Sequence, residues 1–235
     1  MRVFVLTGAG ISAESGLGTF RDPGGIWERF DPMKLATPEA FASDPEQVHA
    51  FYNLRRRDLL AAEPNEGHRA LARLEAALTA SGGSLYLCTQ NIDDLHERAG
   101  SRVVHHMHGE LLKARCTGCG AVVEWRGELD VATACPGCGR RGGMRPDVVW
   151  FGEMPVGLDE AAMAIETSDL FVSIGTSGSV YPAAGFVDIA REAGVRTAEL
   201  NLEPSDNAWA FDERRYGPAG EVVPAFVESL LAGRG

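Results

Sequence analysis

The chain has 235 residues, of which 45% are hydrophobic, and carries a formal net charge of -11. A chain of this length and composition can bury the core of one large domain, alone or with a subdomain, which excludes a disordered protein. The negative charge argues against a nucleic-acid partner, and the absence of any stretch near the roughly 18 apolar residues of a membrane span argues against a membrane partner.

The first predicted element is a buried parallel strand over residues 3–7. The turn after it, Gly8-x-Gly10-x-x-Ala13, fits the dinucleotide fingerprint, in which small residues let backbone amides approach a pyrophosphate at a helix N-terminus. Taken alone, this motif is a weak signal. Because the strand begins so early, it leaves no room for a leader peptide, and we expect a cytoplasmic protein.

In NAD-dependent dehydrogenases this fingerprint continues through a helix into a second strand that ends, about 20 residues on, in an acid that binds the adenosine ribose. The segment that follows here departs from that pattern. Residues 17–25 contain three glycines and a proline and are predicted as an irregular loop, and Asp31 has the spacing of a ribose-binding acid but no strand before it. Next to a phosphate site, such a loop predicts a lid with Arg21 as anion partner and Phe20 as hydrophobic shield. The alternative is a surface loop whose Phe20 fills the core and whose Arg21 is solvated.

A helical insertion is predicted over residues 31–63, because Thr37-Pro38-Glu39 and Ser43-Asp44-Pro45-Glu46 are typical helix starts. One face of its second helix carries Val48, Phe51, Tyr52, Arg55 and Leu59. A guanidinium within that apolar stripe needs an anion, since burying an unpaired charge is prohibitive, whereas Arg56 and Arg57 are predicted to face solvent. A salt bridge from Arg55 to a nearby carboxylate is the structural alternative.

Strands and helices alternate through the rest of the chain. Asn65 is the predicted cap of a helix that Gly82-Gly83 ends. Together with the first strand, the predicted strands are 3–7, 84–89, 103–107, 148–151, 170–174 and 196–202. The sequence therefore predicts an α/β fold with a doubly wound parallel sheet.

Polar residues follow five of these strands, at the sheet edge where ligands bind. Beyond the segment Gly8 to Arg21, they are Gln90, Asn91, Ile92 and Asp93; His108, Gly109 and Glu110; Gly175, Thr176 and Ser177; and Asn201, Leu202 and Glu203. Any one group could be a helix cap, but five together favour a site for phosphate, ribose and carboxamide groups.

His108 is the best candidate for a general base, because it ends a strand and precedes a glycine that lets a ligand come close. The alternative is a structural histidine. The strand alternation also places His106 and His108 on one face, where they could bind a metal ion together. No carboxylate or cysteine at ligand spacing completes such a metal site.

A zinc site is strongly indicated by Cys116-x2-Cys119-x15-Cys135-x2-Cys138. Four thiolates fill all four positions of a tetrahedral zinc ion, so the site is structural and folds a ribbon from about Lys113 to Gly143. Disulfides or a redox pair are the alternatives. Cys88, within an apolar strand, is predicted to be a buried core thiol.

These motifs resemble, in order and over essentially the whole chain, those of the sirtuins, the NAD-dependent protein lysine deacylases. The shared motifs are Gly-Ala-Gly-Ile-Ser-Ala-Glu-Ser-Gly, Thr-Phe-Arg, Thr-Gln-Asn-Ile-Asp, His-Gly-Glu, the two Cys-x-x-Cys pairs, Phe-Gly-Glu, Gly-Thr-Ser and Asn-Leu-Glu. The resemblance implies a Rossmann-like domain of residues 1–30, 64–112 and 144–235, and a smaller domain made of the helical module 31–63 and the zinc ribbon 113–143. Leu17-Gly18 departs from the family pattern and implies a more flexible lid.

The resemblance also implies the site residues. His108 and Asn91 would be catalytic, and one structural zinc ion would be bound by Cys116, Cys119, Cys135 and Cys138. NAD would be bound by Gly8, Ala9, Gly10, Ser12, Ala13, Thr19, Phe20, Arg21, Trp27, Gln90, Asn91, Ile92, Asp93, Gly175, Thr176, Ser177, Asn201, Leu202, Glu203 and Ala219. The acylated protein or peptide would be bound by Tyr52, Arg55, Val148, Phe151, Gly152, Glu153, Val180 and Tyr181.

By the same resemblance, the acyl oxygen attacks the ribose carbon that bears nicotinamide, and His108 activates a ribose hydroxyl that attacks the resulting alkylimidate. The products are lysine, nicotinamide and O-acyl-ADP-ribose. Tyr52-x-x-Arg55 resembles the branch that removes succinyl and malonyl groups, and Ala13 fits a roomier acyl pocket. The alternatives are an NAD or ADP-ribose binding module, a mono-ADP-ribosyltransferase, or a zinc-ribbon interaction protein.

Overall fold

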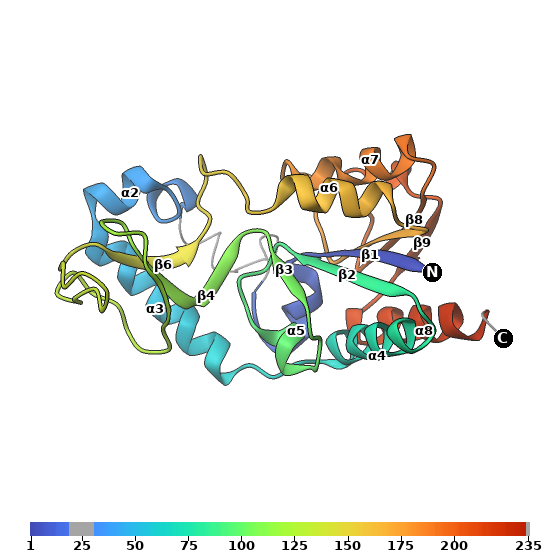
Figure 1. Cartoon of the computed structure of the whole chain (residues 1–235), viewed down its shortest axis with the longest axis horizontal. Helices are drawn as coiled ribbons and strands as arrows, with labels where there is room; N and C mark the ends of the chain where they lie inside the picture. Colours follow the sequence, from blue (N-terminus) through green and yellow to red (C-terminus); the bar gives the residue numbers. More distant parts are fainter. Residues whose placement is uncertain (19–30, 234–235) are drawn as a thin grey trace.

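The computed structural model describes residues 1–18 and 31–233. Two sheets organise them, a six-stranded parallel sheet at one end of the elongated molecule and a three-stranded antiparallel sheet at the other (Figure 1). Among the described residues, no helix has the length and apolar character needed to cross a membrane.

The large sheet has its first strand near the middle. Across the sheet the order is β3 (Val104–His106), β2 (Ser84–Thr89), β1 (Arg2–Thr7), β7 (Leu170–Ile174), β8 (Arg196–Asn201) and β9 (Glu213–Tyr216). All neighbouring strands are parallel. The strand order therefore reverses between β1 and β7, and in open parallel sheets a ligand crevice forms at the carboxyl ends of such a pair.

Helices cover both faces of this sheet (Figure 1). One face packs on α4 (Glu66–Ala80) and α8 (Ala219–Ala232), and the other on α6 (Leu158–Glu166) and α7 (Phe186–Glu192). Strand β1 is buried on both sides, since Val3 and Val5 belong to the first core and Phe4 and Leu6 to the second. The prediction of a doubly wound parallel sheet is confirmed.

The predicted helix starts are confirmed as well. The side chains of Thr37 and Asp44 accept hydrogen bonds from the first turns of α2 (Pro38–Ser43) and α3 (Pro45–Ala61), and Asn65 does the same for α4. Within residues 1–18 and 31–233, the remaining elements are four short 3-10 helices and one short α-helix: η1 (Ala9–Ser15), η2 (Pro32–Lys34), α5 (Leu95–Arg98), η3 (Ala183–Gly185) and η4 (Ala208–Ala210).

The second sheet corrects one predicted strand. Its order is β5 (Val122–Glu124), β4 (Gly109–Cys116) and β6 (Met144–Val148). A strand over 148–151 was wrong, because β6 ends at Val148 and pairs with β4, and the backbone N–H of Trp150 then donates to the Glu153 carboxylate (2.8 Å). Strand β4 spans the predicted boundary between residues 112 and 113, and the domain boundaries stay a prediction.

Helix α3 has a second buried face that corrects another expectation. Arg56 is only 2% exposed, although it was predicted to face solvent. Its Nε donates to the Leu111 carbonyl (3.1 Å) and its Nη1 to the Asn53 side chain (2.9 Å), which also bonds the backbone of Leu129. The ribbon segment thus covers this face, while Arg57 is exposed, as predicted, and pairs with Glu128.

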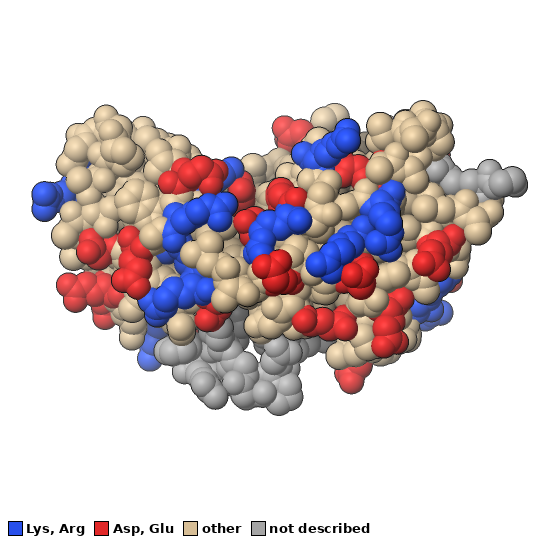
Figure 2. Space-filling view, turned by 90° about the horizontal axis from the view of Figure 1, so that it is seen from below, with Lys and Arg blue, Asp and Glu red and all other residues tan. Residues whose placement is uncertain are grey.

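Charges on the outer surface are mixed in sign. On the face shown in Figure 2, basic and acidic side chains lie interspersed. Ion pairs of the described residues include Arg98 with Glu63 (3.0 Å) and Arg69 with Glu66 (2.9 Å). Exposed pairs of this kind contribute little to stability, about 0 to 1 kcal/mol each, so packing of the cores decides the fold.

The turns after β1 and β7 touch backbone to backbone. Gly8 and Gly10 donate to the carbonyls of Ile174 and Gly175, each at 2.9 Å. A Cβ on Gly175, which has a φ of +63°, would lie 2.5 Å from the Ile11 nitrogen, and one on Gly10 would lie 2.7 Å from the Gly175 Cα. Glycine is required here for the turns to meet.

We expect Gly175→Ala to destabilise the protein more than Gly194→Ala does. Both positions have positive φ, which costs a side chain about 1 to 2 kcal/mol. Only Gly175 adds a backbone clash, because nothing lies within 4 Å of a Cβ on Gly194, and overpacking costs about 1 to 3 kcal/mol more. Urea unfolding of both variants measures the difference, and equal losses would contradict this account.

Candidate active site

A buried polar network links the ends of β1 and β2. The Asn91 amide donates to the Gly8 carbonyl and to the Ser12 hydroxyl, both at 3.1 Å. The Ser12 hydroxyl donates in turn to the Asp93 carboxylate (3.0 Å). Burial raises the pKa of Asp93. The structure thus brings together three predicted site residues, Ser12, Asn91 and Asp93, at the glycine turn.

Two buried histidines lie beneath this network and were not predicted as part of it. His68 Nε2 is 3.4 Å from the Ser12 hydroxyl, and its ring meets that of His96 with centroids 4.9 Å apart. His96 Nε2 is 3.0 Å from the Thr7 hydroxyl, which donates to Thr89. Burial lowers the pKa of His68 to about 4 and that of His96 well below its ordinary value, so both are neutral at neutral pH.

His108 follows β3 and lies beside the same turn. Its Nδ1 is 2.9 Å from the Gln90 carbonyl oxygen, which can only accept, so Nδ1 carries the proton and Nε2 keeps its lone pair. Burial lowers the pKa of His108, partly offset by that hydrogen bond. A neutral imidazole with a free Nε2 has the form that a general base needs.

His106, the last residue of β3, approaches the same segment as His108. Its Nδ1 lies 3.4 Å from the Asn91 carbonyl and its Nε2 lies 2.6 Å from the Glu97 carboxylate. Although burial opposes it, the bond to Glu97 raises the pKa of His106. Among the described residues, no metal-ligand cluster includes either histidine.

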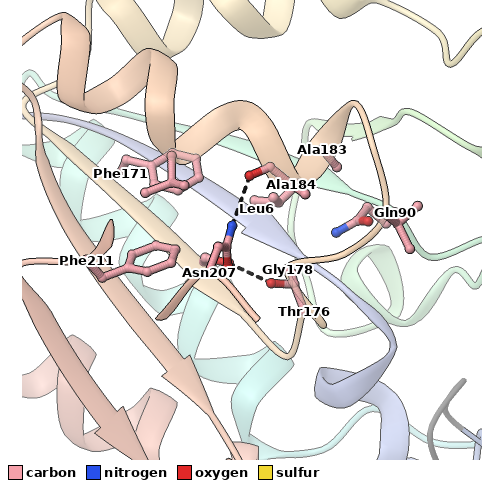
Figure 3. A pocket seen from close by; sticks show the side chains of 12 residues that line it. Leu6, Gln90, Phe171, Thr176, Gly178, Ala183, Ala184, Asn207 and Phe211 are labelled. Carbon is pink, nitrogen blue, oxygen red and sulfur yellow. Dashed lines mark hydrogen bonds between the residues drawn. The ribbon is translucent and has the colours of Figure 1, made fainter. Parts of the chain in front are cut away.

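The ends of β7 and β8 close the other side of the crevice. The Asn201 amide donates to the Thr176 carbonyl (2.7 Å), and the Ser177 hydroxyl lies 2.8 Å from that of Ser179. Leu202 and Glu203 are exposed beyond them. Figure 3 shows that Gln90 and Thr176, from different strand ends, line one pocket beside the core residues Leu6 and Phe171.

Ala219 begins α8, whose N-terminus already has an anion. The Gly220 N–H donates to the Glu14 carboxylate at 2.6 Å, and Pro218 supplies no side-chain cap. A carboxylate at this position compensates the positive end of the helix dipole. Ala219 is therefore near η1, but a phosphate at this helix end would face the Glu14 charge.

Tyr52 and Arg55 occupy the inner face of α3. Tyr52 is 3% exposed, and its hydroxyl accepts a hydrogen bond from the Trp150 indole at 2.9 Å. The Arg55 guanidinium lies 5.7 Å from the centre of the Phe51 ring and 6.0 Å from that of Tyr52. Burial lowers the pKa of Arg55, while the charges of Tyr52 and Asp93 oppose the shift.

Both predicted peptide edges include exposed residues. Phe151 and Gly152 on one side, and Val180 and Tyr181 on the other, are exposed, with Tyr181 at 75%. Val148 is buried. The Glu153 carboxylate forms a bidentate ion pair with Arg145 (2.7 and 2.9 Å). Since that carboxylate already has a partner, the backbone groups of this edge are the ones left to bind a peptide.

The four ribbon cysteines form one cluster, with all sulfurs within 4.8 Å of one another. The Cys116–Cys138 and Cys119–Cys135 sulfurs are 3.8 and 3.7 Å apart. Tetrahedral thiolates about 2.3 Å from zinc are separated by about 3.8 Å, so the donor set fits this ion. The N–H groups of Gly118 and Gly137 donate to two of the sulfurs. Cys88 is buried and separate, as predicted, and burial raises its pKa to about 12.

The structure leaves part of the predicted site without a description. Thr19, Phe20, Arg21 and Trp27 lie outside the described residues. Conversely, the sequence interpretation missed Thr7, Thr89, His68 and His96 under the turn, and Trp150 and Arg145 beside Tyr52. The alternation of β1 and β2 could have indicated the threonines, whereas the histidines depend on how helices pack.

We expect the purified protein to hold about one zinc ion per chain, bound by all four thiolates. Cys135→Ser should release the zinc and destabilise the small sheet, because a structural ion contributes its binding energy to folding. Elemental analysis and urea unfolding measure both effects. Cys88→Ser is the matched control, and a fall in its zinc content, or a full zinc load in Cys135→Ser, would contradict the assignment.

The comparisons with known proteins agree on one family. The sequence model of the Sir2 family matches residues 8–182. The NAD-dependent protein deacylase of Caulobacter vibrioides is 61% identical over 232 residues, covering 99% of this chain and 98% of that protein. The NAD-dependent protein deacylase of Escherichia coli strain K12 is 56% identical over 234 residues, covering 99% of this chain and 83% of that protein.

Solved structures are similar over the same extent. A Sir2 homologue in complex with NAD has a TM-score of 0.88 at 40% identity, covering 100% of this chain and 91% of its own. A histidine-to-alanine Sir2 variant with a deacetylated p53 peptide and 3'-O-acetyl ADP ribose has a TM-score of 0.78 at 29% identity, covering 98% of this chain and 92% of its own. Sequence and structure together show that this chain belongs to the Sir2 family.

Proposed function

We propose that this chain removes acetyl groups and the acidic succinyl and malonyl groups from lysine side chains of proteins or peptides, producing nicotinamide and O-acyl-ADP-ribose. Its broader class, an NAD-dependent protein deacylase, follows from the family and from the names of relatives at 61% and 56% identity. The observation that carries the finer proposal is the position of Arg55 on the inner face of α3, with its guanidinium carbon 5.7 Å from the centre of the Phe51 ring and 6.0 Å from that of the Tyr52 ring.

The crevice between β1 and β7 suits a dinucleotide. Gly8 and Gly10 let the turn after β1 meet the turn after β7, and the Ser12, Asn91 and Asp93 side chains form the polar wall of the crevice. NAD supplies a ribose carbon that takes the acyl oxygen as nicotinamide leaves. His108, with Nε2 unprotonated, would take a proton from a ribose hydroxyl, and the Asn91 amide is held by its hydrogen bonds to Gly8 and Ser12.

The acyl end of the substrate would lie between α3 and this crevice. Arg55 offers a permanent charge and Tyr52 a hydroxyl, and a carboxylate between them gains charge-assisted hydrogen bonds. Acetyl lacks that carboxylate and gains nothing from the pair. The alternative role for Arg55, a salt bridge to an acidic side chain such as Asp58, makes no distinction between acyl groups.

The peptide would add as a strand between the exposed segments at Phe151-Gly152 and Val180-Tyr181, through main-chain hydrogen bonds. Backbone contacts of this kind imply weak sequence preference around the lysine. The zinc ion would hold the ribbon and take no part in the reaction. We also propose the cytoplasm as the location and residues 1–30, 64–112 and 144–235 as the NAD-binding domain.

Arg55→Met should raise KM for a succinyl-lysine peptide about 10- to 100-fold, since a hydrogen bond to a charged group contributes about 1.5 to 3 kcal/mol. Deacetylation should be nearly unchanged, because acetyl makes no contact that needs the charge. Nicotinamide release with matched acetyl and succinyl peptides measures both.

Arg57→Met is the control for this experiment, because it removes an exposed arginine of the same helix. Equal losses of deacetylation and desuccinylation in Arg55→Met would refute the proposal that Arg55 and Tyr52 bind the acyl carboxylate. Nicotinamide release without free lysine would point instead to an ADP-ribosyltransferase, and NAD binding without either product to a binding module.

The lowered pKa of His108 predicts how kcat/KM should decline at acidic pH. The unprotonated form is active, so kcat/KM should stay level as the pH falls to the ordinary histidine value of 6.5 and decline only below it. His108→Ala should lower kcat/KM about 100- to 10,000-fold and abolish this decline. A decline centred above 6.5, or one that persists in His108→Ala, would assign the base to another group.

A further inference from the structure

The Tyr52 hydroxyl accepts a hydrogen bond from the Trp150 side chain. The indole Nε1 donates to the phenolic oxygen at 2.9 Å, and both side chains are almost fully buried, at 3% and 2% exposure. An indole N–H can only donate, so the hydroxyl's own proton must point to a different acceptor. In residues 1–18 and 31–233, no side chain or carbonyl accepts that proton.

Trp150 is itself fixed on two sides. The Arg145 guanidinium carbon lies 3.4 Å from the centre of its ring, and Arg145 makes two hydrogen bonds to the Glu153 carboxylate. The same carboxylate accepts the Trp150 backbone N–H at 2.8 Å. The indole therefore has little freedom to turn, and its N–H remains aimed at Tyr52.

We infer that Trp150 is a positioning residue for acyl specificity: by donating to the Tyr52 oxygen, it directs the Tyr52 proton toward the acyl pocket beside Arg55. This inference rests on the proposed desuccinylase activity. Tyr52 then presents a donor, not an acceptor, to the end of the acyl chain. A terminal carboxylate gains from this orientation, whereas an acetyl methyl group has no atom that could use it.

A purely structural role for Trp150 predicts something else. The indole belongs to the apolar cluster of α3, β4 and β6, and its loss as packing would affect every substrate alike. The two roles are separated by removing the N–H while keeping an aromatic ring between Arg145 and Tyr52, which Trp150→Phe does.

Trp150→Phe should raise KM for a succinyl-lysine peptide about three- to tenfold, as expected for one hydrogen bond, with kcat and deacetylation nearly unchanged. In a Tyr52→Phe background the same substitution should have no further effect, because the hydroxyl that it positions is gone. Trp125→Phe is the matched control, since Trp125 donates its indole N–H to the Glu128 carbonyl in the ribbon (3.1 Å).

The indole N–H resonance of Trp150 gives a readout that does not depend on turnover. It should shift in Tyr52→Phe and, in the unsubstituted protein, on adding a succinyl-lysine peptide but not an acetyl-lysine peptide. A desuccinylase whose succinyl-to-acetyl KM ratio is unchanged by Trp150→Phe would overturn this inference alone. A protein that deacetylates but never desuccinylates would overturn the proposed specificity and this inference together.

Discussion

The contact between the turns after β1 and β7 is the constraint on which the site depends. The two turns approach so closely that Gly8, Gly10 and Gly175 have no room for a side chain. This approach places Ser12 within reach of Asn91 and Asp93, so the polar wall forms where the strand order reverses. Glycines that look like ligand-binding residues in the sequence are thus also packing residues, and both roles favour the same amino acid.

Burial sets the protonation states around this wall. His68 and His96 lie under Ser12 without a counter-charge, and burial keeps them neutral, so they supply hydrogen-bonding groups that carry no charge into the core. Burial also lowers the pKa of His108, which borders the crevice, whereas the hydrogen bond to Glu97 outweighs burial and raises the pKa of His106. The protonation behaviour of these four histidines therefore depends on the groups packed around each of them.

The sequence predicted those features that are local or that repeat regularly. Strand 84–89, the Asn65 cap and the cysteine pairs depend on short patterns, and the structure has them at those positions. Strand β9 was missed because Glu213-Arg-Arg-Tyr216 is an edge strand with no apolar alternation. Arg56 was misplaced because a helix pattern identifies one buried face, and nothing local reveals a second partner. The Trp150–Tyr52 bond joins residues 98 positions apart, beyond any local pattern.

The buried side of α3 has a mechanical consequence. Arg56 and Asn53 join this helix to Leu111 and Leu129 through hydrogen bonds shielded from water. Sliding the ribbon along the helix would leave the buried Arg56 guanidinium without its hydrogen-bond partners, so these bonds favour a single arrangement of helix and ribbon. These bonds hold α3, which carries Tyr52 and Arg55, against the small sheet whose strand β6 leads to Trp150.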